Sequence, residues 1–158
     1  TLTPVLGVVK PENRKGFVVA DIPGLIENAH KGAGLGFEFL RHVERTSLLL
    51  HLVDVSAIVP GDPVENFTKI NNELELYSLE LIKKYMAVAA TKIDAAVPEN
   101  LEKLRTHCLQ EGYEFFPISA VTGAGLDQLM NFLADKVEEG RKLRESEYKE
   151  QETVIEGE

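Results

Sequence analysis

The sequence predicts a mixed α/β protein with a doubly wound, mostly parallel sheet and flanking helices. Three nearly continuous apolar runs, at residues 48–54, 85–90 and 113–118, have the composition of strands that are buried on both faces. Segments with helical spacing of apolar residues lie between these runs, and the connections are short. Because parallel strands need crossover connections, this alternation favours a parallel sheet with right-handed crossovers.

The elements follow in order along the chain. Two short extended segments, residues 2–9 and 15–20, surround a turn at 10–13 and predict a hairpin. A Gly-rich stretch from Gly24 to Gly36 comes next. Helices are then expected at 35–46, at 64–84 with a break near Ser78, at 98–111 with Gly112 as the stop, and from Leu126 through Val137.

The length of 158 residues fits one domain and leaves no room for a second full one. Beyond Leu143 the apolar periodicity is lost, and the sequence becomes a mixture of Glu and Lys. This segment is expected to form a frayed helix end or a disordered linker. We therefore divide the chain into a partial domain, residues 1–143, and an acidic tail or linker, residues 144–158.

The composition narrows the classes of function. A net charge of -9 and a pI near 5.0 disfavour a broad nucleic-acid-binding surface, although they leave room for a local basic patch. The single cysteine, Cys108, excludes an internal disulfide, and no apolar stretch approaches the roughly 18 residues needed to span a membrane. We expect a soluble, cytoplasmic monomer. The four histidines show no metal-ligand spacing, and His51 is expected to be a hydrogen-bonded core residue.

A first polar motif, Asp21 followed by Gly24, stands where the second extended segment ends. The carboxyl ends of the strands form the edge of an α/β sheet where ligands bind. A glycine three residues later lets a backbone N–H approach a charged group closely. The motif is therefore typical of a phosphate sensor.

Two further strand ends carry the chemistry for reading guanine. Asp94, two residues after Lys92, can accept hydrogen bonds from both N1–H and the exocyclic amine of guanine, whereas adenine has no such donor pair. The stem of Lys92 can cover the flat face of the base, and a backbone N–H in Ser119-Ala120 can donate to O6. In the structural alternative, Asp21 and Asp94 cap helices and Ser119 caps a turn.

These motifs occur together with five longer segments: residues 1–9 (TLTPVLGVV), 21–27 (DIPGLIE), 32–36 (GAGLG), 39–46 (FLRHVERT) and 119–123 (SAVTG). The combination resembles the translation-factor-like GTPases and, more closely, the Obg family, across nearly the whole chain. The resemblance implies that Thr1 is the switch I threonine that contacts Mg²⁺, that Asp21 holds the ion through a water, and that the Gly24 N–H meets the γ-phosphate. It implies that guanine is bound by Thr91, Lys92, Asp94, Ser119, Ala120 and Val121, and no residue is assigned as catalytic.

Three departures from the family pattern stand out. The phosphate loop G-x-x-x-x-G-K-[ST] is absent from the sequence, Thr91 replaces the usual Asn, and Asn28 replaces a usual Gly. The strand that leads into the phosphate loop would lie between the strands that end at Asp21 and Asp54. Without it two strand edges lack partners, so we expect a domain truncated before switch I, whose complete form has residues before Thr1.

The expected function is that of a GTP-binding switch protein. Leu25 stands where many GTPases have a water-orienting Gln, so the resemblance suggests slow GTP hydrolysis, helped by a monovalent cation or by the ribosome. Leu25 is also a candidate packing residue. The family implies Mg²⁺ as cofactor and a role in assembly of the large ribosomal subunit, and this chain alone is expected to be inactive. The alternative is a non-hydrolysing, protein-binding module built on a GTPase scaffold.

Overall fold

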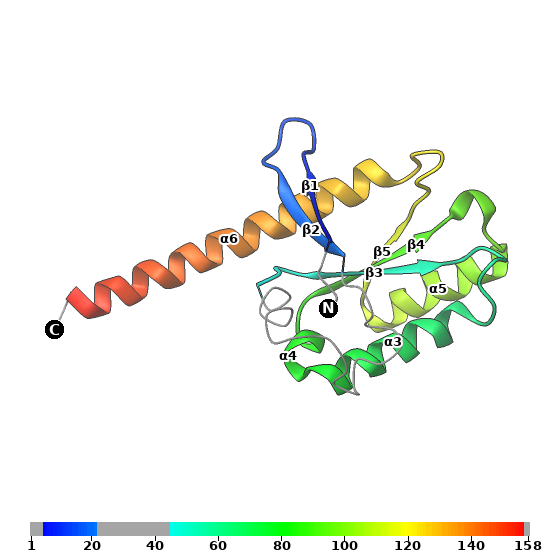
Figure 1. Cartoon of the computed structure of the whole chain (residues 1–158), viewed down its shortest axis with the longest axis horizontal. Coiled ribbons are helices and arrows are strands. Elements are labelled where there is room, and N and C mark those ends of the chain that lie inside the picture. The colour runs from blue at the N-terminus through cyan, green and yellow to red at the C-terminus, as the bar shows by residue number, and fades with distance from the viewer. Residues whose placement is uncertain (1–4, 22–44, 157–158) are drawn as a thin grey trace.

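The computed structural model describes residues 5–21 and 45–156, which form two separate β-sheets and the helices that pack on them (Figure 1). The strands are β1 (Val5–Val9), β2 (Phe17–Asp21), β3 (Leu49–Asp54), β4 (Met86–Thr91) and β5 (Glu114–Pro117). The helices are α3 (Pro63–Tyr77), α4 (Leu79–Ile82), α5 (Pro98–Glu111) and α6 (Leu126–Glu156), with a 3-10 turn, η2, at Ile93–Ala95. The expected helix at 35–46 falls almost wholly outside the described residues.

The sheets confirm a mixed α/β fold with parallel strands. β3, β4 and β5 form a parallel sheet in the order β3-β4-β5, and β1 and β2 form an antiparallel hairpin with Val9 opposite Phe17. In the described part of the chain no ladder joins β2 to β3. That gap is where the sequence predicts an absent central strand, and the doubly wound arrangement of the complete sheet stays a prediction.

The prediction that a strand is buried on both faces is confirmed for only one of the three expected strands. Every residue of β4 from Met86 to Ala90 is buried, because β4 is the central strand of its sheet. In β3 the side chains alternate, with Val53 buried and Leu52 56% exposed, and β5 is half-buried. Strands at the edge of a sheet have fewer neighbours, so a continuous apolar run does not guarantee burial on both faces.

Two apolar clusters lie on opposite faces of the parallel sheet. Val88 of β4 belongs to a cluster with Phe67, Leu81 and Leu104, which come from α3, α4 and α5. The next residue along β4, Ala89, belongs to a second cluster that holds Phe17 of the hairpin together with Ile118, Leu129 and Leu133. Since alternate residues of a strand point to opposite faces, helices cover both sides of β4. The hairpin is held by α6 through Phe17.

Local sequence signals explain where the helices begin and end. Ser78 ends α3 and caps α4, where its Oγ accepts a hydrogen bond from the Leu81 N–H at 3.4 Å, so the expected break is confirmed. Pro98 stands at the start of α5, and Gly112 ends it in a left-handed conformation with φ +78°.

The C-terminal segment differs from the expectation of a frayed end or a disordered linker. α6 continues without interruption to Glu156, and residues 142–152 are exposed. Loss of apolar periodicity there reflects a solvated helix rather than a break, since Glu, Lys, Arg and Gln all favour helix. None of the helices in the described residues is long and apolar enough to cross a membrane.

Candidate functional site

The loops that follow β4 and β5 meet at the carboxyl edge of the parallel sheet. The Ile118 N–H donates to the Ala90 carbonyl at 2.8 Å, and the Ile93 N–H donates to the Ile118 carbonyl at 3.2 Å. These bonds continue the pairing of β4 with β5 beyond the strands themselves. The two loops predicted to read guanine are therefore tied together by their backbones.

Asp94 and Ser119 are joined directly across these loops. Ser119 is fully buried, and its Oγ donates to Asp94 Oδ1 at 2.6 Å while accepting from the Thr122 N–H at 3.1 Å. The Asp94 carboxylate is thus oriented by a buried hydroxyl, although Asp94 itself is exposed. Within the described residues Asp94 does not cap η2, whereas Ser119 caps a turn as the structural alternative expected.

The loop after β5 has a tight conformation that depends on glycine. Gly125 has φ +74°, and a Cβ there would stand 2.1 Å from the carbonyl oxygen of Pro117, so no other residue fits without a shift of the backbone. The Ser119 N–H donates to the Ala124 carbonyl at 2.9 Å, so it is not available to a ligand. In the described residues no hydrogen bond engages the N–H groups of Ala120 or Val121, which are both exposed.

Lys92 is held by a residue that the sequence analysis did not select. Its backbone is left-handed, with φ 59°, and its Nζ lies 2.7 Å from Asp54 Oδ2. The Asp54 side chain is 17% exposed and also accepts from the Ser56 N–H at 2.8 Å. Partial burial acts to raise the pKa of the Asp54 carboxyl, but hydrogen bonds from Lys92 and Ser56 outweigh it and lower that pKa. The sequence contained a signal that could have identified Asp54, because Asp54 ends an apolar run just as Asp21 does.

The predicted phosphate and metal residues are only partly described. Asp21 is exposed at the end of β2, in the other sheet, whereas Thr1, Gly24 and Leu25 lie outside the described residues. A carboxylate oxygen is the ligand type that Mg²⁺ prefers, so Asp21 fits one part of such a site. No group of three His, Cys, Asp or Glu side chains that could hold a metal occurs in residues 5–21 and 45–156.

His51 is a core residue, but it lacks the expected hydrogen bond. Its ring stacks on Phe67 with 4.7 Å between ring centroids, and it is 8% exposed. Neither ring nitrogen has a hydrogen-bond partner of normal geometry in the described structure, and the same holds for the buried Oδ1 of Asn71. Burial lowers the pKa of His51 to about 4, and the nearby Asn71 side chain offsets this only in part.

The fold and the converging loops define an α/β protein with a polar site at the carboxyl edge of a parallel sheet. Residues 1–92, more than half of the chain, match the family described as "50S ribosome-binding GTPase". Proteins named GTPase Obg are similar over most of the chain. The identity is 63% over 138 residues in Thermodesulfovibrio yellowstonii, 53% over 140 in Alkaliphilus oremlandii and 51% over 142 in Aquifex aeolicus. The chain belongs to the 50S ribosome-binding GTPases and, among them, to the Obg GTPase family.

The similarity covers the chain more fully than it covers the relatives. The alignments include 87%, 88% and 89% of this chain but only 41%, 33% and 41% of the three relatives. The chain therefore corresponds to well under half of each relative's length.

Proposed function

We propose that this chain is the guanine-reading part of an Obg-type, GTP-hydrolysing switch domain. The observation that carries the proposal is the 2.6 Å hydrogen bond from Ser119 Oγ to Asp94 Oδ1, which orients a carboxylate that is itself exposed. The second oxygen, Oδ2, has no hydrogen-bond partner within the described residues, and Oδ1 has a further lone pair. Both can accept from the N1–H and amino group of guanine.

The surrounding groups complete a base pocket. The ion pair with Asp54 fixes the end of the Lys92 side chain, whose stem then covers one face of the base. Because the Ser119 N–H is already used, the donor to guanine O6 is the N–H of Ala120 or Val121. Thr91, the last residue of β4, places these groups at the sheet edge. Adenine would leave the Asp94 carboxylate unpaired, which favours guanine.

Phosphate binding needs groups that the sequence of this chain lacks. A G-x-x-x-x-G-K-[ST] segment would supply the backbone cradle, the lysine and a hydroxyl for Mg²⁺. Asp21 and Thr1 would hold the ion, and the Gly24 N–H would face the γ-phosphate. When bound, Mg²⁺ neutralises charge on the phosphates. We propose that hydrolysis is slow because Leu25 cannot orient water, and that a monovalent cation or the large ribosomal subunit accelerates it. By the family's description, that subunit is also the proposed partner.

Two titrations of this chain test the proposal. With labelled GTP and Mg²⁺ we expect little or no binding, and micromolar or tighter affinity would contradict the argument about the phosphate cradle. With GMP, observed by NMR, we expect weak binding that shifts the amide signals of residues 92–95 and 119–122. AMP is the matched control and should leave these signals in place. Equal shifts with both nucleotides would remove the guanine assignment.

The alternative, a protein-binding module without hydrolysis, predicts no response to either base. One observation favours it. Leu6, Val8 and Val18 lie on one face of the hairpin and are each more than 60% exposed, which is unusual for large apolar side chains. The GMP titration separates the two functions, because only the first requires that residues 92–95 respond to guanine.

A further inference from the structure

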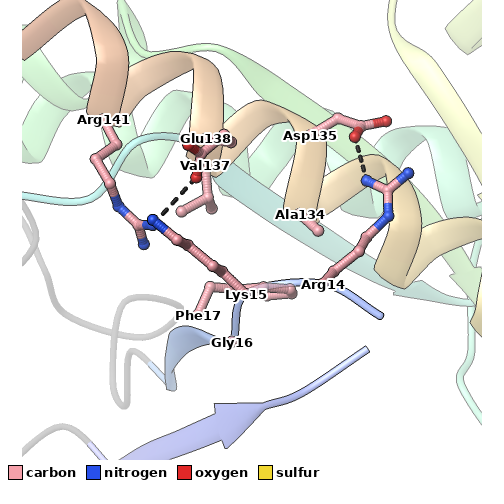
Figure 2. Close-up of a pocket in the computed structure, with 9 residues that line it drawn as sticks. All are labelled: Arg14, Lys15, Gly16, Phe17, Ala134, Asp135, Val137, Glu138 and Arg141. Atoms are coloured by element: carbon pink, nitrogen blue, oxygen red, sulfur yellow. Dashed lines mark hydrogen bonds and ion pairs between the residues drawn. The ribbon is translucent and has the colours of Figure 1, made fainter. Parts of the chain in front are cut away.

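A second site lies between the turn of the hairpin and α6 (Figure 2). It is a cavity of about 270 Å³, formed by residues other than those that would read guanine. Apolar atoms of Phe17, Ala134 and Val137 contribute to its lining, and charged side chains complete it. Figure 2 shows Arg14 and Arg141 at opposite ends of the cavity, with Lys15 between them.

The carboxylates that line the cavity are both engaged. Asp135 forms an ion pair with Arg14, and Glu138 forms one with Arg141 at 3.1 Å. Arg14 Nη1 also donates to the carbonyl of Asn131 at 3.3 Å. Each arginine is thus held in place while other N–H groups of its guanidinium are unused. Lys15 has no ion-pair partner in residues 5–21 and 45–156.

The positive charge continues on both sides of the cavity. Lys10 flanks the turn, since its Cγ lies 3.1 Å from the point where a Cβ on Gly16 would stand. Arg144 is one turn of α6 beyond Arg141 and donates to the carbonyl of Arg45 at 3.4 Å. We define the basic patch as Lys10, Arg14, Lys15, Arg141 and Arg144.

The net charge of the basic patch is opposite in sign to the net charge of the whole chain. The whole chain has 17 Lys and Arg against 26 Asp and Glu. The cavity itself is lined by three cations, Arg14, Lys15 and Arg141, against the two engaged carboxylates. Next to it along α6, Arg144 and Lys149 line a second hollow together with Glu145 and Glu152. A local excess of positive charge on an acidic protein needs an explanation, because a random distribution would give the opposite sign.

We propose that the basic patch docks on the phosphate backbone of RNA. Guanidinium groups that are already oriented lose little entropy when they bind phosphate, and the free Lys10 and Lys15 supply charge without a carboxylate to displace. The choice of RNA as the polyanion rests on the proposed function, since a 50S ribosomal subunit is rich in RNA.

Binding of this 158-residue chain to a labelled RNA duplex of about 20 base pairs, without nucleotide, tests the proposal. The test variant is Lys10→Glu/Lys15→Glu, which changes two exposed side chains without partners in the described structure. The control is Lys69→Glu/Lys83→Glu, which makes the same change of charge on exposed residues of α3 and of the segment after α4. Circular dichroism confirms that each variant is folded.

We expect the test variant to bind RNA at least about tenfold more weakly at low salt and the control to lose less than about twofold. Raising the salt from about 50 to 200 mM should weaken wild-type binding, and the slope of log affinity against log salt should fall by about two in the test variant. Equal losses in both variants, or no binding by the wild type at low salt, would overturn the proposal.

Two further measurements distinguish RNA binding by the basic patch from guanine binding at the other site and from binding of an acidic polypeptide. Addition of GMP should leave RNA binding unchanged, because the basic patch shares no residue with the loops that would read guanine, so a failure of the guanine assignment would not affect the result. Polyglutamate at the same concentration of charge should compete poorly for the basic patch. Full displacement of RNA by polyglutamate would show that the surface binds acidic polypeptide equally well and would contradict the assignment to RNA.

Discussion

The ammonium group of Lys92 lies 2.7 Å from the carboxylate of Asp54, which joins the ends of β3 and β4. β3 pairs with β4 in parallel, so Asp54 lies directly opposite Thr91, one residue before Lys92. Lys92 has φ 59°, a conformation that costs a non-glycine residue roughly 1–2 kcal/mol. The ion pair holds the side chain of this residue. We infer that Asp54 positions the loop that we propose to bind guanine.

Replacing Asp54 by Ala should therefore loosen Lys92 and destabilise the protein. We expect a loss of about 1 kcal/mol in the free energy of unfolding, since the Lys92 side chain is 52% exposed and the ion pair is screened. Urea denaturation gives the energy, and the Lys92 amide signal reports the change in the loop. Glu80→Ala is the control. Glu80 forms an ion pair with Lys83, but the two side chains are 74% and 70% exposed, so this ion pair should contribute little to stability. Equal losses in the two variants would argue against the positioning role.

The choice of base should depend on one oxygen of Asp94. In a protein that carries a strand and a G-x-x-x-x-G-K-[ST] segment before Thr1, Asp94→Asn should shift the preference from guanine towards xanthine. The amide can donate where the carboxylate could only accept, and xanthine offers a carbonyl at the position of the guanine amine. Competition between GTP and XTP measures the shift. An unchanged preference for GTP would remove Asp94 from the pocket.

Gly125→Ala should cost far more stability than Gly112→Ala. Both glycines have positive φ, +74° and +78°, but a Cβ on Gly112 would meet open space. We expect about 1–2 kcal/mol at Gly112 and roughly 3 kcal/mol or more at Gly125, where the Pro117 carbonyl must move. Urea denaturation of the two variants compares them directly. Similar losses would show that the loop after β5 adapts easily, and that Ser119 does not depend on it.

Stability should fall as the pH drops from neutral, because His51 is buried in its neutral form. The pKa of His51 is about 4 in the folded protein against 6.5 for the ordinary side chain, so the unfolded chain binds the proton first. The stabilisation is complete above pH 6.5 and is lost between pH 6.5 and 4, up to about 3 kcal/mol. Denaturation at a series of pH values measures the loss.

His51→Phe should flatten the pH dependence in that window, since phenylalanine keeps the stacking on Phe67 and cannot titrate. The lowered pKa of Asp54 affects stability at lower pH. The stabilisation by the Asp54 carboxylate is present above its ordinary pKa of 3.8 and is lost as the pH falls below that value. This second loss of stability should therefore remain in His51→Phe. A variant with the wild-type slope between pH 6.5 and 4 would show that another group is responsible.

The sequence was most informative where local rules decide the structure. The hairpin, the break at Ser78, and the limits of α5 at Pro98 and Gly112 were all predicted correctly. Each follows from the conformations that single residues allow. The roles of Thr1, Asp21 and Gly24 stay predictions.

The sequence was less informative where burial depends on distant neighbours. It predicted strands buried on both faces, but the edge position of β3 leaves Leu52 exposed. It predicted a hydrogen bond for His51, but the neighbouring side chains, Asn71 included, supply none of normal geometry. It also placed the end of the regular helix near Leu143, whereas charged residues continue α6 to Glu156.

The sequence by itself determined the family, the order of the elements and the residue types at the strand ends, because motif spacing and helix signals are local. Only the tertiary structure decided which of these residues touch. Ser119 reaches Asp94 because β5 lies beside β4, and Asp54 reaches Lys92 because β3 lies on the other side. Pairs separated by 25 and 38 positions meet through the order of strands in the sheet, which the chain acquires only when it folds.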